Sequence, residues 1–261
     1  MLNKLLKKDL KRNMRWMWIL FVATVGMALL TRGCKALGKN IMFFQILGIF
    51  FDSVFYSAAV NVILQPFLRN LMNFTKSLYG DESYLTHTLP VTKSQLITSK
   101  FLTAMLEITL GFVTLVVSLL IMFWTPDMFD SLQGLIYLWL GSNLSAVLVL
   151  FLFVCLVLVE FLMFNMIIFC AIVLAYRAKE KRLLKTFLYT CAMAFVAITV
   201  LAVVMVIVLA MNGVDLSATS LSLTGTALLS LLITGISIYS VITIAFYFLT
   251  KKFFKQGVNI D

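Results

Sequence analysis

The chain has 261 residues, of which 62% are hydrophobic and only 12% charged, and its formal net charge at pH 7 is +10. Ordinary soluble domains have roughly 45–50% apolar and about 25% charged residues, so this composition excludes a soluble globular protein. Several apolar runs exceed the ~18 residues that a helix needs to cross about 30 Å of hydrocarbon, and the strict alternation of outer-membrane strands is absent. We therefore expect an all-α integral membrane protein with a single transmembrane domain over residues 1–261.

The first 13 residues form a basic, amphipathic segment. Apolar residues recur at helical spacing, and Lys and Arg hold much of the opposite face: Leu2, Leu5, Leu6, Leu10 and Met14 against Lys4, Lys7, Lys8, Lys11 and Arg12. This pattern is typical of a helix that lies in the plane of the lipid headgroups. A basic flank that only orients the first span is the alternative. We expect the segment to be retained, because Arg32 stands too close to Cys34 for a signal-peptide cleavage site.

Six membrane spans are expected, at about residues 14–31, 41–68, 100–124, 144–176, 186–211 and 222–250. The apolar run over residues 135–176 is too long for one upright helix. It predicts either an external interfacial piece before the fourth span or a strong tilt of that span. Small and hydroxyl residues between Ser222 and Ser237 predict a close helix contact in the last span.

The basic residues mark the orientation of these spans. Six Lys and Arg precede the first span, four lie in the second loop, five in the fourth loop and three in the tail, which places 18 of the 21 on the side of both termini. Cytoplasmic loops retain Lys and Arg, so both termini are expected in the cytoplasm. The positive charge is thereby explained by topology, and we expect no nucleic-acid partner.

Two features imitate catalytic motifs. Residues 33–40 match a phosphate-binding loop as far as its lysine, but Asn40 stands where Ser or Thr should hold magnesium, and no buried strand precedes the loop. His87 is the only histidine, which excludes a paired-histidine metal site; we expect a solvated loop residue, with a catalytic role as the alternative. The four cysteines are scattered. We expect no metal site, no directly bound cofactor and no ATP hydrolysis by this chain alone.

Three acidic residues, Asp52, Glu107 and Glu160, fall within the expected spans. A charge at the middle of the membrane costs about 2.5–3.5 kcal/mol on insertion scales, so each acid should be paired, near an interface or beside water. Glu107 is seven residues beyond Lys100, about 10 Å along a helix, which favours pairing with a basic residue at the headgroup level. For Asp52 and Glu160, structural and functional roles are equally open.

A polar stretch, YGDESYLTHTLPVTKSQ, interrupts the apolar sequence at residues 79–95. Thr92 and Gln95 have the spacing of a helix-opening capping box before the third span. Two spans therefore descend to and ascend from one short cytoplasmic turn, and a partner that pushes on the turn would move both. A solvated hairpin is the alternative, but the mixture of apolar and acidic residues favours an exposed docking surface: Tyr79, Gly80, Asp81, Glu82, Tyr84, Leu85 and Pro90.

At these residues the chain resembles the permease subunits of ABC-2 type ABC transporters. Short bacterial members have a pattern like Y-G-D-E-x-Y-L-T-x-T-L-P-V followed by S-x-L-I-x-S-K. The matching positions here are Tyr79-Gly80-Asp81-Glu82, Tyr84-Leu85-Thr86, Thr88-Leu89-Pro90-Val91, Ser94, Leu96-Ile97 and Ser99-Lys100. Ser83 and His87 occupy the variable places of this pattern.

The resemblance implies a type V exporter-like permease fold in the bacterial cytoplasmic membrane. Residues 70–99 would be the coupling region and residues 1–13 the connecting helix. Two permease chains, identical or related, would work with two copies of a separate ATP-binding subunit, which binds ATP and Mg. The expected cargo is amphipathic or hydrophobic, and a peptide, for export or self-protection, is the leading expectation.

Two other classes of function stay open. A membrane-embedded enzyme would need a convergent catalytic cluster, for which one histidine and three separated acids are poor material. A non-transporting scaffold or sensor subunit would bind the ATPase without moving a cargo.

Overall fold

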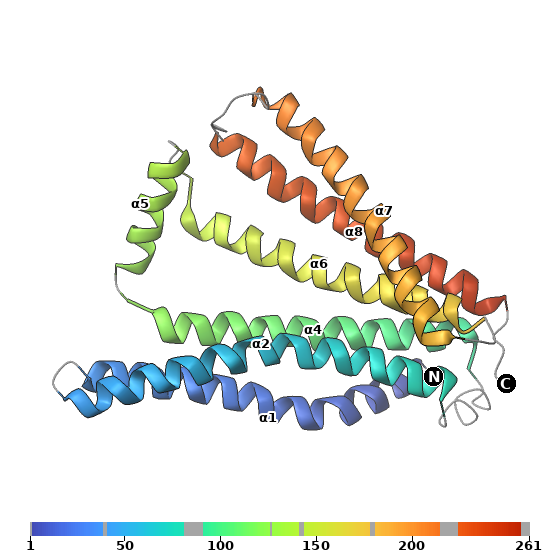
Figure 1. Cartoon of the computed structure of the whole chain (residues 1–261), viewed down its shortest axis with the longest axis horizontal. Helices are drawn as coiled ribbons and strands as arrows, with labels where there is room; N and C mark the ends of the chain where they lie inside the picture. Colours follow the sequence, from blue (N-terminus) through green and yellow to red (C-terminus); the bar gives the residue numbers. More distant parts are fainter. Residues whose placement is uncertain are drawn as a thin grey trace. The chain divides into compact units, whose positions relative to one another are not determined.

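The computed structural model describes residues 2–38, 41–80, 91–125, 127–140, 144–177, 181–214 and 224–256. All regular secondary structure within these ranges is helical. The helices are α1 (Leu2–Leu37), α2 (Met42–Tyr79), α4 (Lys93–Phe123), α5 (Met128–Leu140), α6 (Ala146–Ala175), α7 (Arg182–Met211) and α8 (Gly225–Lys255) (Figure 1). All of them except α5 are long and apolar enough to cross a membrane, which confirms the expected number of spans.

The helices form two compact units, Met1–Thr125 and Pro126–Asp261. In the first unit, α1 packs against both α2 and α4, and α2 packs against α4. Its apolar core has two clusters, one around Ala28, Phe55 and Met122 and one around Met17 and Val62. The first unit is therefore a three-helix bundle in which each helix contacts the other two.

A close crossing of α2 and α4 lies within this first unit. Pro66 has no backbone N–H, so the carbonyl of Val62, four residues earlier, has no helical donor. Gly111 of α4 faces that carbonyl: a Cβ at position 111 would lie 2.8 Å from the Val62 oxygen. A glycine is needed here because only hydrogen on Cα lets the two backbones approach, and a weak Cα–H···O contact becomes available to the carbonyl.

The second unit is built mainly from apolar contacts. Helix α6 packs against α5, α7 and α8, and α7 packs against α8. The core includes Met163, Ile167, Ala197 and Tyr239. Gly235 of α8 lets the side chains of Leu156 and Met205 come close, because a Cβ there would lie 2.8 and 3.0 Å from their terminal atoms. This packing agrees with the predicted close contact of the last span.

Arg177, just after α6, joins the end of α6 to the end of α8 by hydrogen bonds. Its guanidinium donates to the backbone carbonyl of Phe253 and, over 3.0 Å, to the side-chain oxygen of Gln256, both at the end of α8. The last carbonyls of a helix have no partner within that helix, so this arginine satisfies one of them.

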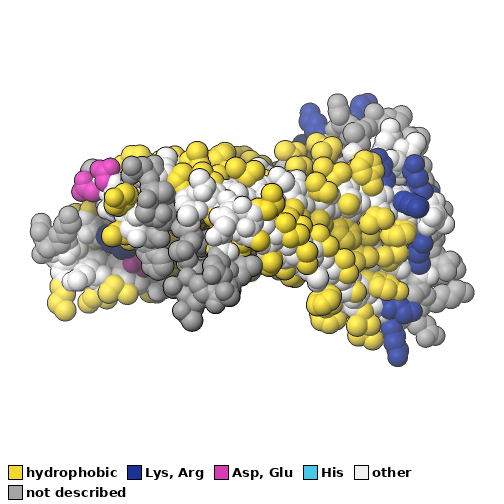
Figure 2. Space-filling view, turned by 90° about the horizontal axis from the view of Figure 1, so that it is seen from above, with side chains coloured by type: hydrophobic (Ala, Val, Ile, Leu, Met, Phe, Trp, Pro, Cys, Tyr) yellow, Lys and Arg dark blue, Asp and Glu magenta, His cyan; other side chains and the backbone are white. Residues whose placement is uncertain are grey.

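Large apolar side chains are exposed on every span helix. Val22, Phe50 and Phe195 are 67%, 61% and 72% exposed. In Figure 2, apolar side chains cover much of the displayed surface. A water-soluble protein buries such residues, whereas a lipid-facing helix presents them to hydrocarbon. These surfaces support an integral membrane protein.

The helices are longer than the predicted spans because hydropathy marks only the segment within hydrocarbon. Helix α2 has 38 residues, about 57 Å of helix, and continues to Tyr79 rather than ending near residue 68. Helix α4 begins at Lys93 instead of residue 100. Helix α5 ends at Leu140 and a separate helix, α6, begins at Ala146, which agrees with the first of the two alternatives for the long apolar run, a separate piece before the span.

Helix α1 differs from the prediction of a separate helix over residues 1–13. It runs without a break from Leu2 to Leu37. The reason is one continuous buried face, with positions three or four residues apart: Asp9, Asn13, Met17, Phe21, Thr24, Ala28 and Thr31. Because the face that packs against the neighbouring helices continues past residue 13, the helix continues there without a break.

Candidate functional site

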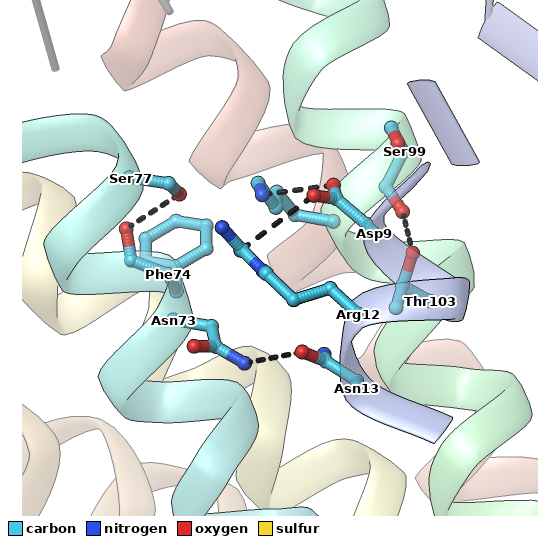
Figure 3. Close-up of polar contacts among 9 residues, drawn as sticks. Asp9, Arg12, Asn13, Asn73, Phe74, Ser77, Ser99 and Thr103 are labelled. Atoms are coloured by element: carbon cyan, nitrogen blue, oxygen red, sulfur yellow. Dashed lines mark hydrogen bonds and ion pairs between the residues drawn. The ribbon is translucent and has the colours of Figure 1, made fainter. Parts of the chain in front are cut away.

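A group of polar side chains, most of them buried or partly buried, lies where α1 begins, α2 ends and α4 begins (Figure 3). We call it the polar cluster; its members are Asp9, Arg12 and Asn13 of α1, Arg69, Asn70 and Asn73 of α2, and Lys100 and Glu107 of α4. It lies entirely within the first unit. These helix ends flank the segment over residues 81–90, so the cluster is next in sequence to the predicted docking surface.

The strongest contact in the polar cluster is an ion pair between α1 and α4. Lys100 Nζ lies 2.8 Å from Asp9 Oδ2, and both side chains are about nine-tenths buried. The Arg12 guanidinium lies 3.7 Å from the other carboxylate oxygen of Asp9. Removing one partner from such a pair leaves the other charge buried and uncompensated, which is far more costly than removing both.

A second contact joins α1 to α2. Asn73 Nδ2 donates a hydrogen bond of 2.8 Å to Asn13 Oδ1, as Figure 3 shows. Asn13 is 3% exposed. Since Asp9 and Asn13 are four residues apart, the two contacts leave the same face of α1, one toward each neighbouring helix.

Glu107 lies deepest in the polar cluster. Its side chain is 0% exposed. The amide side chains of Asn13 and Asn70 and the positively charged Arg69 interact with its carboxylate. A buried acid needs such neighbours because an isolated carboxylate is very costly in a medium of low dielectric constant.

Both helix ends that flank residues 81–90 are well defined. Thr92 Oγ1 accepts from Gln95 N–H, and Gln95 Oε1 accepts from Thr92 N–H, each over 3.3 Å, which confirms the predicted capping box at the start of α4. At the end of α2, Gly80 N–H donates to the Lys76 carbonyl over 3.2 Å. A Cβ at position 80 would lie 2.9 Å from that oxygen, so the close approach requires glycine.

Only two of the predicted docking residues are described. Tyr79 is the last residue of α2 and is half-buried rather than exposed, and Gly80 follows it directly. The others, Asp81, Glu82, Tyr84, Leu85 and Pro90, lie outside the described residues, as does His87. Their roles stay predictions.

The three acids within the spans lie in three different surroundings. Asp52 forms an ion pair with Lys35 of α1, with Nζ 2.9 Å from Oδ1. Glu107 belongs to the polar cluster, where Arg69 faces it, while Lys100 pairs with Asp9 instead. Glu160 of α6, in the second unit, is partly buried and interacts with Tyr239 of α8. The acids therefore make separate local contacts.

Sequence reasoning missed Asp9 and the asparagines of the polar cluster. The available signals were weak: Asp9 is the only acid among the first 50 residues, and Asn70 and Asn73 follow an apolar span at a spacing of three. The sequence did not indicate the contact partners of these residues, because the partners are distant in the chain: Asp9 and Lys100 are 91 positions apart.

The cluster's contacts are electrostatic, and they join helices. Among the described residues, no three His, Cys, Asp or Glu side chains come together in a way that suits a metal ion. The ion pair and the amide pair fix the start of α1 against both helices that flank residues 81–90. The arrangement is suited to holding helix ends in one geometry.

No protein family, curated protein or solved structure matches this chain.

Proposed function

We propose that this chain is the membrane-spanning permease subunit of an ATP-driven exporter of the ABC-2 type, in the bacterial cytoplasmic membrane. A separate ABC subunit, present in two copies, binds ATP and Mg and hydrolyses the nucleotide. A second permease chain, identical or related, completes the path. The cargo is amphipathic or hydrophobic, with a peptide as the leading candidate. The chain has no catalytic site of its own in this proposal.

The observation that carries the proposal is that the two long membrane helices on either side of residues 81–90 are both joined to α1. Helix α2 ends at Tyr79 and α4 begins at Lys93, and both are joined to α1 through the polar cluster. A force applied at these two helix ends therefore acts on three packed helices together. This is the mechanical property that a permease needs at the place where it meets its ATPase.

The distribution of charge supports the proposed orientation. In the first unit, ten Lys and Arg lie on the polar-cluster ends of the helices, over residues 4–15, 69–76 and 93–100, and the described ones at the opposite ends are Arg32 and Lys35. In the second unit all Lys and Arg lie in residues 177–185 and 251–255, at the end of α6, the start of α7 and the end of α8. The positive-inside rule then favours these ends, the termini and residues 81–90 on the cytoplasmic side.

The start of α1 supports a role at the cytoplasmic membrane surface. Its buried face is used for the polar cluster, and its six basic residues are all exposed: Lys4, Lys7, Lys8, Lys11, Arg12 and Arg15. Trp16 and Trp18 follow and are 61% and 58% exposed, as is usual for aromatic side chains at the lipid–water boundary. In the proposed transporter this segment works as the connecting helix, although it continues directly into the first span.

Charge reversal in the docking segment tests the proposal. The variant Asp81→Lys/Glu82→Lys should still insert in the membrane but should lose the ATP-binding subunit during purification and lose transport, because acidic residues would no longer meet the partner's surface. The matched control is Asp127→Lys/Asp130→Lys, which reverses two exposed acids in and just before α5. The control should retain the ATP-binding subunit. Unchanged co-purification and transport in the Asp81/Glu82 variant would overturn the docking assignment.

A further inference from the structure

A groove runs along the first unit between α1 and α4. One part of it has a volume of about 430 Å³, and a second part, at the end of α4, about 450 Å³. Val117 lines both parts, so they adjoin. Apart from Arg32, the polar side chain in the walls is Thr114, whose hydroxyl already donates to the Leu110 carbonyl over 2.8 Å. The apolar walls include Trp18, Val22 and Leu29 of α1 and Val113, Leu120 and Trp124 of α4.

Arg32 lines the groove where α4 ends. Its Nη1 donates to the Ile121 carbonyl over 3.1 Å, and this carbonyl is one of the last in α4, which ends at Phe123. Arg32 is exposed, and none of the ion pairs among the described residues includes it. A guanidinium has five N–H donors in a planar fork. The bond to Ile121 uses one of them, so the others are available to an anion.

The position of Arg32 along α1 is unusual for a basic residue of this chain. In the proposed orientation it lies on the outer side, where the positive-inside rule makes Lys and Arg rare. Lys35, at the same end, has a local reason to be there, because its Nζ lies 2.9 Å from Asp52 Oδ1. Trp124, which lines the same part of the groove, is 51% exposed, as is usual at the lipid–water boundary. Arg32 is therefore a cation at the depth of the lipid headgroups.

The groove extends from Arg32 toward the middle of the membrane. At 3.6 residues per turn, Arg32 falls within the arc of α1 between Phe21 and Leu29, which also line the groove. Val22 is ten residues from Arg32, about 15 Å along the helix. This is half of the ~30 Å hydrocarbon thickness, the depth of one leaflet. A cation at one end and an apolar channel of this length complement a molecule that has an anionic head and a hydrocarbon chain.

We infer that this groove binds an anionic phospholipid, with its phosphate paired to Arg32 and an acyl chain along α1 and α4. Arginine suits this task because its fork can donate two parallel hydrogen bonds to a phosphate. A lipid with net negative charge is favoured over phosphatidylcholine, whose own cation competes with Arg32 for the phosphate. The inference goes beyond the proposed function, and only the choice of the outer leaflet depends on the proposed orientation.

Site-specific photocrosslinking tests this inference. The full chain is placed in nanodiscs of equal parts phosphatidylglycerol and phosphatidylcholine with identical acyl chains. It carries a photoreactive benzoylphenylalanine at Trp124, which lines the groove, or at Phe43, which is 64% exposed at the same end of the unit and does not line it. The ratio of crosslinked phosphatidylglycerol to phosphatidylcholine should be about five at position 124 and near one at position 43.

Three variants, each with the crosslinker at position 124, separate the roles of charge and apolar surface. Arg32→Gln should lower the lipid ratio to near one. Lys35→Gln is the matched control, because it removes one positive charge at the same end of α1 but does not line the groove, and it should leave the ratio unchanged. Gly26→Leu should also lower the ratio, because its new side chain enters open space in the groove without a change of charge. Variants are compared only at equal yields of monodisperse protein.

Four results would overturn the inference. Equal lipid ratios at positions 124 and 43 would indicate unselective contact with the bilayer. An effect of Lys35→Gln as large as that of Arg32→Gln would indicate attraction to general surface charge. Loss of the phosphatidylglycerol preference on addition of inorganic phosphate, but not of sodium chloride at equal ionic strength, would indicate a site for free anions. Crosslinking at position 124 to a second copy of the chain in place of lipid would make the groove an interface between protein chains.

Discussion

The contacts that hold the helices together within the first unit differ in kind from those within the second. Eleven of the fourteen buried polar or charged side chains in the described part of the chain belong to the first unit, including the three charged ones, Asp9, Lys100 and Glu107. The second unit has three, Asn165, Thr243 and Thr250. Paired polar groups inside a membrane protein satisfy one another in one arrangement, whereas apolar surfaces pack nearly as well after a small shift.

The difference suits different tasks in the proposed transporter. The first unit flanks the predicted docking segment, and its polar cluster fixes three helix ends in register. In the second unit, the side chains that fill the space around Gly235 are flexible ones, Leu156 and Met205. We expect the first unit to transmit motion and the second to adapt its packing. The following variants test that contrast.

The largest effect is expected at the buried ion pair. Lys100→Met leaves buried Asp9 with only the more distant and more exposed Arg12 and should destabilise the protein by about 3–5 kcal/mol. Asp9→Leu/Lys100→Met should restore most of that loss because neither charge of the buried pair remains. Thermal unfolding in detergent measures both variants, with Lys35→Met, at the exposed partner of Asp52, as the milder control. An equal loss of stability in the single and double variants would show that the charges of Asp9 and Lys100 do not stabilise the helix ends.

A smaller effect is expected at the glycine crossings. In Gly111→Ala the new methyl would lie 2.8 Å from a backbone oxygen of α2, which cannot move alone, so destabilisation of about 1–3 kcal/mol is expected. Gly235→Ala meets only side-chain ends and should cost less than about 1 kcal/mol. Gly26→Ala, with no atom within 4 Å of the new methyl, is the control and should not destabilise. If Gly235→Ala destabilised the protein more than Gly111→Ala in unfolding experiments, the contrast between the units would be rejected.

The smallest effect is expected at the capping box. Thr92→Ala removes the side-chain acceptor of the Gln95 N–H and should lower stability by about 1 kcal/mol. Hydrogen exchange should rise mainly in the first turn of α4, next to the docking segment, because a lost cap frays its own helix end. Thr92→Ser, which keeps the hydroxyl, should behave as the wild type. Unchanged exchange in Thr92→Ala would show that other contacts fix this helix end.

The number of spans and the capping box followed from local patterns. Hydropathy identified six apolar runs, and the Thr92–Gln95 spacing identified the start of α4. These predictions succeeded because each depends on neighbouring residues and on the thickness of hydrocarbon.

Contacts between distant residues could not be predicted in this way. The pairing of Asp9 with Lys100 joins positions 91 apart, and the approach of Gly111 to Val62 depends on the missing N–H of Pro66 on another helix. The continuity of α1 past residue 13 was missed for the same reason. By its sequence alone, a basic amphipathic stretch is typical of a helix at the membrane surface, and the helices that bury its other face are not evident from that pattern. The local sequence pattern predicts which face of a helix is polar, but tertiary packing determines which residues that face contacts.

Purification of the tagged chain from its native membrane in mild detergent tests the central claim most directly, followed by identification of bound subunits and measurement of vanadate-sensitive ATPase activity. The account predicts a stoichiometric ATP-binding subunit and vanadate-sensitive ATP hydrolysis by the complex. A chain that is isolated alone in several mild detergents, without such activity, would contradict the permease assignment and favour the enzyme or scaffold alternatives.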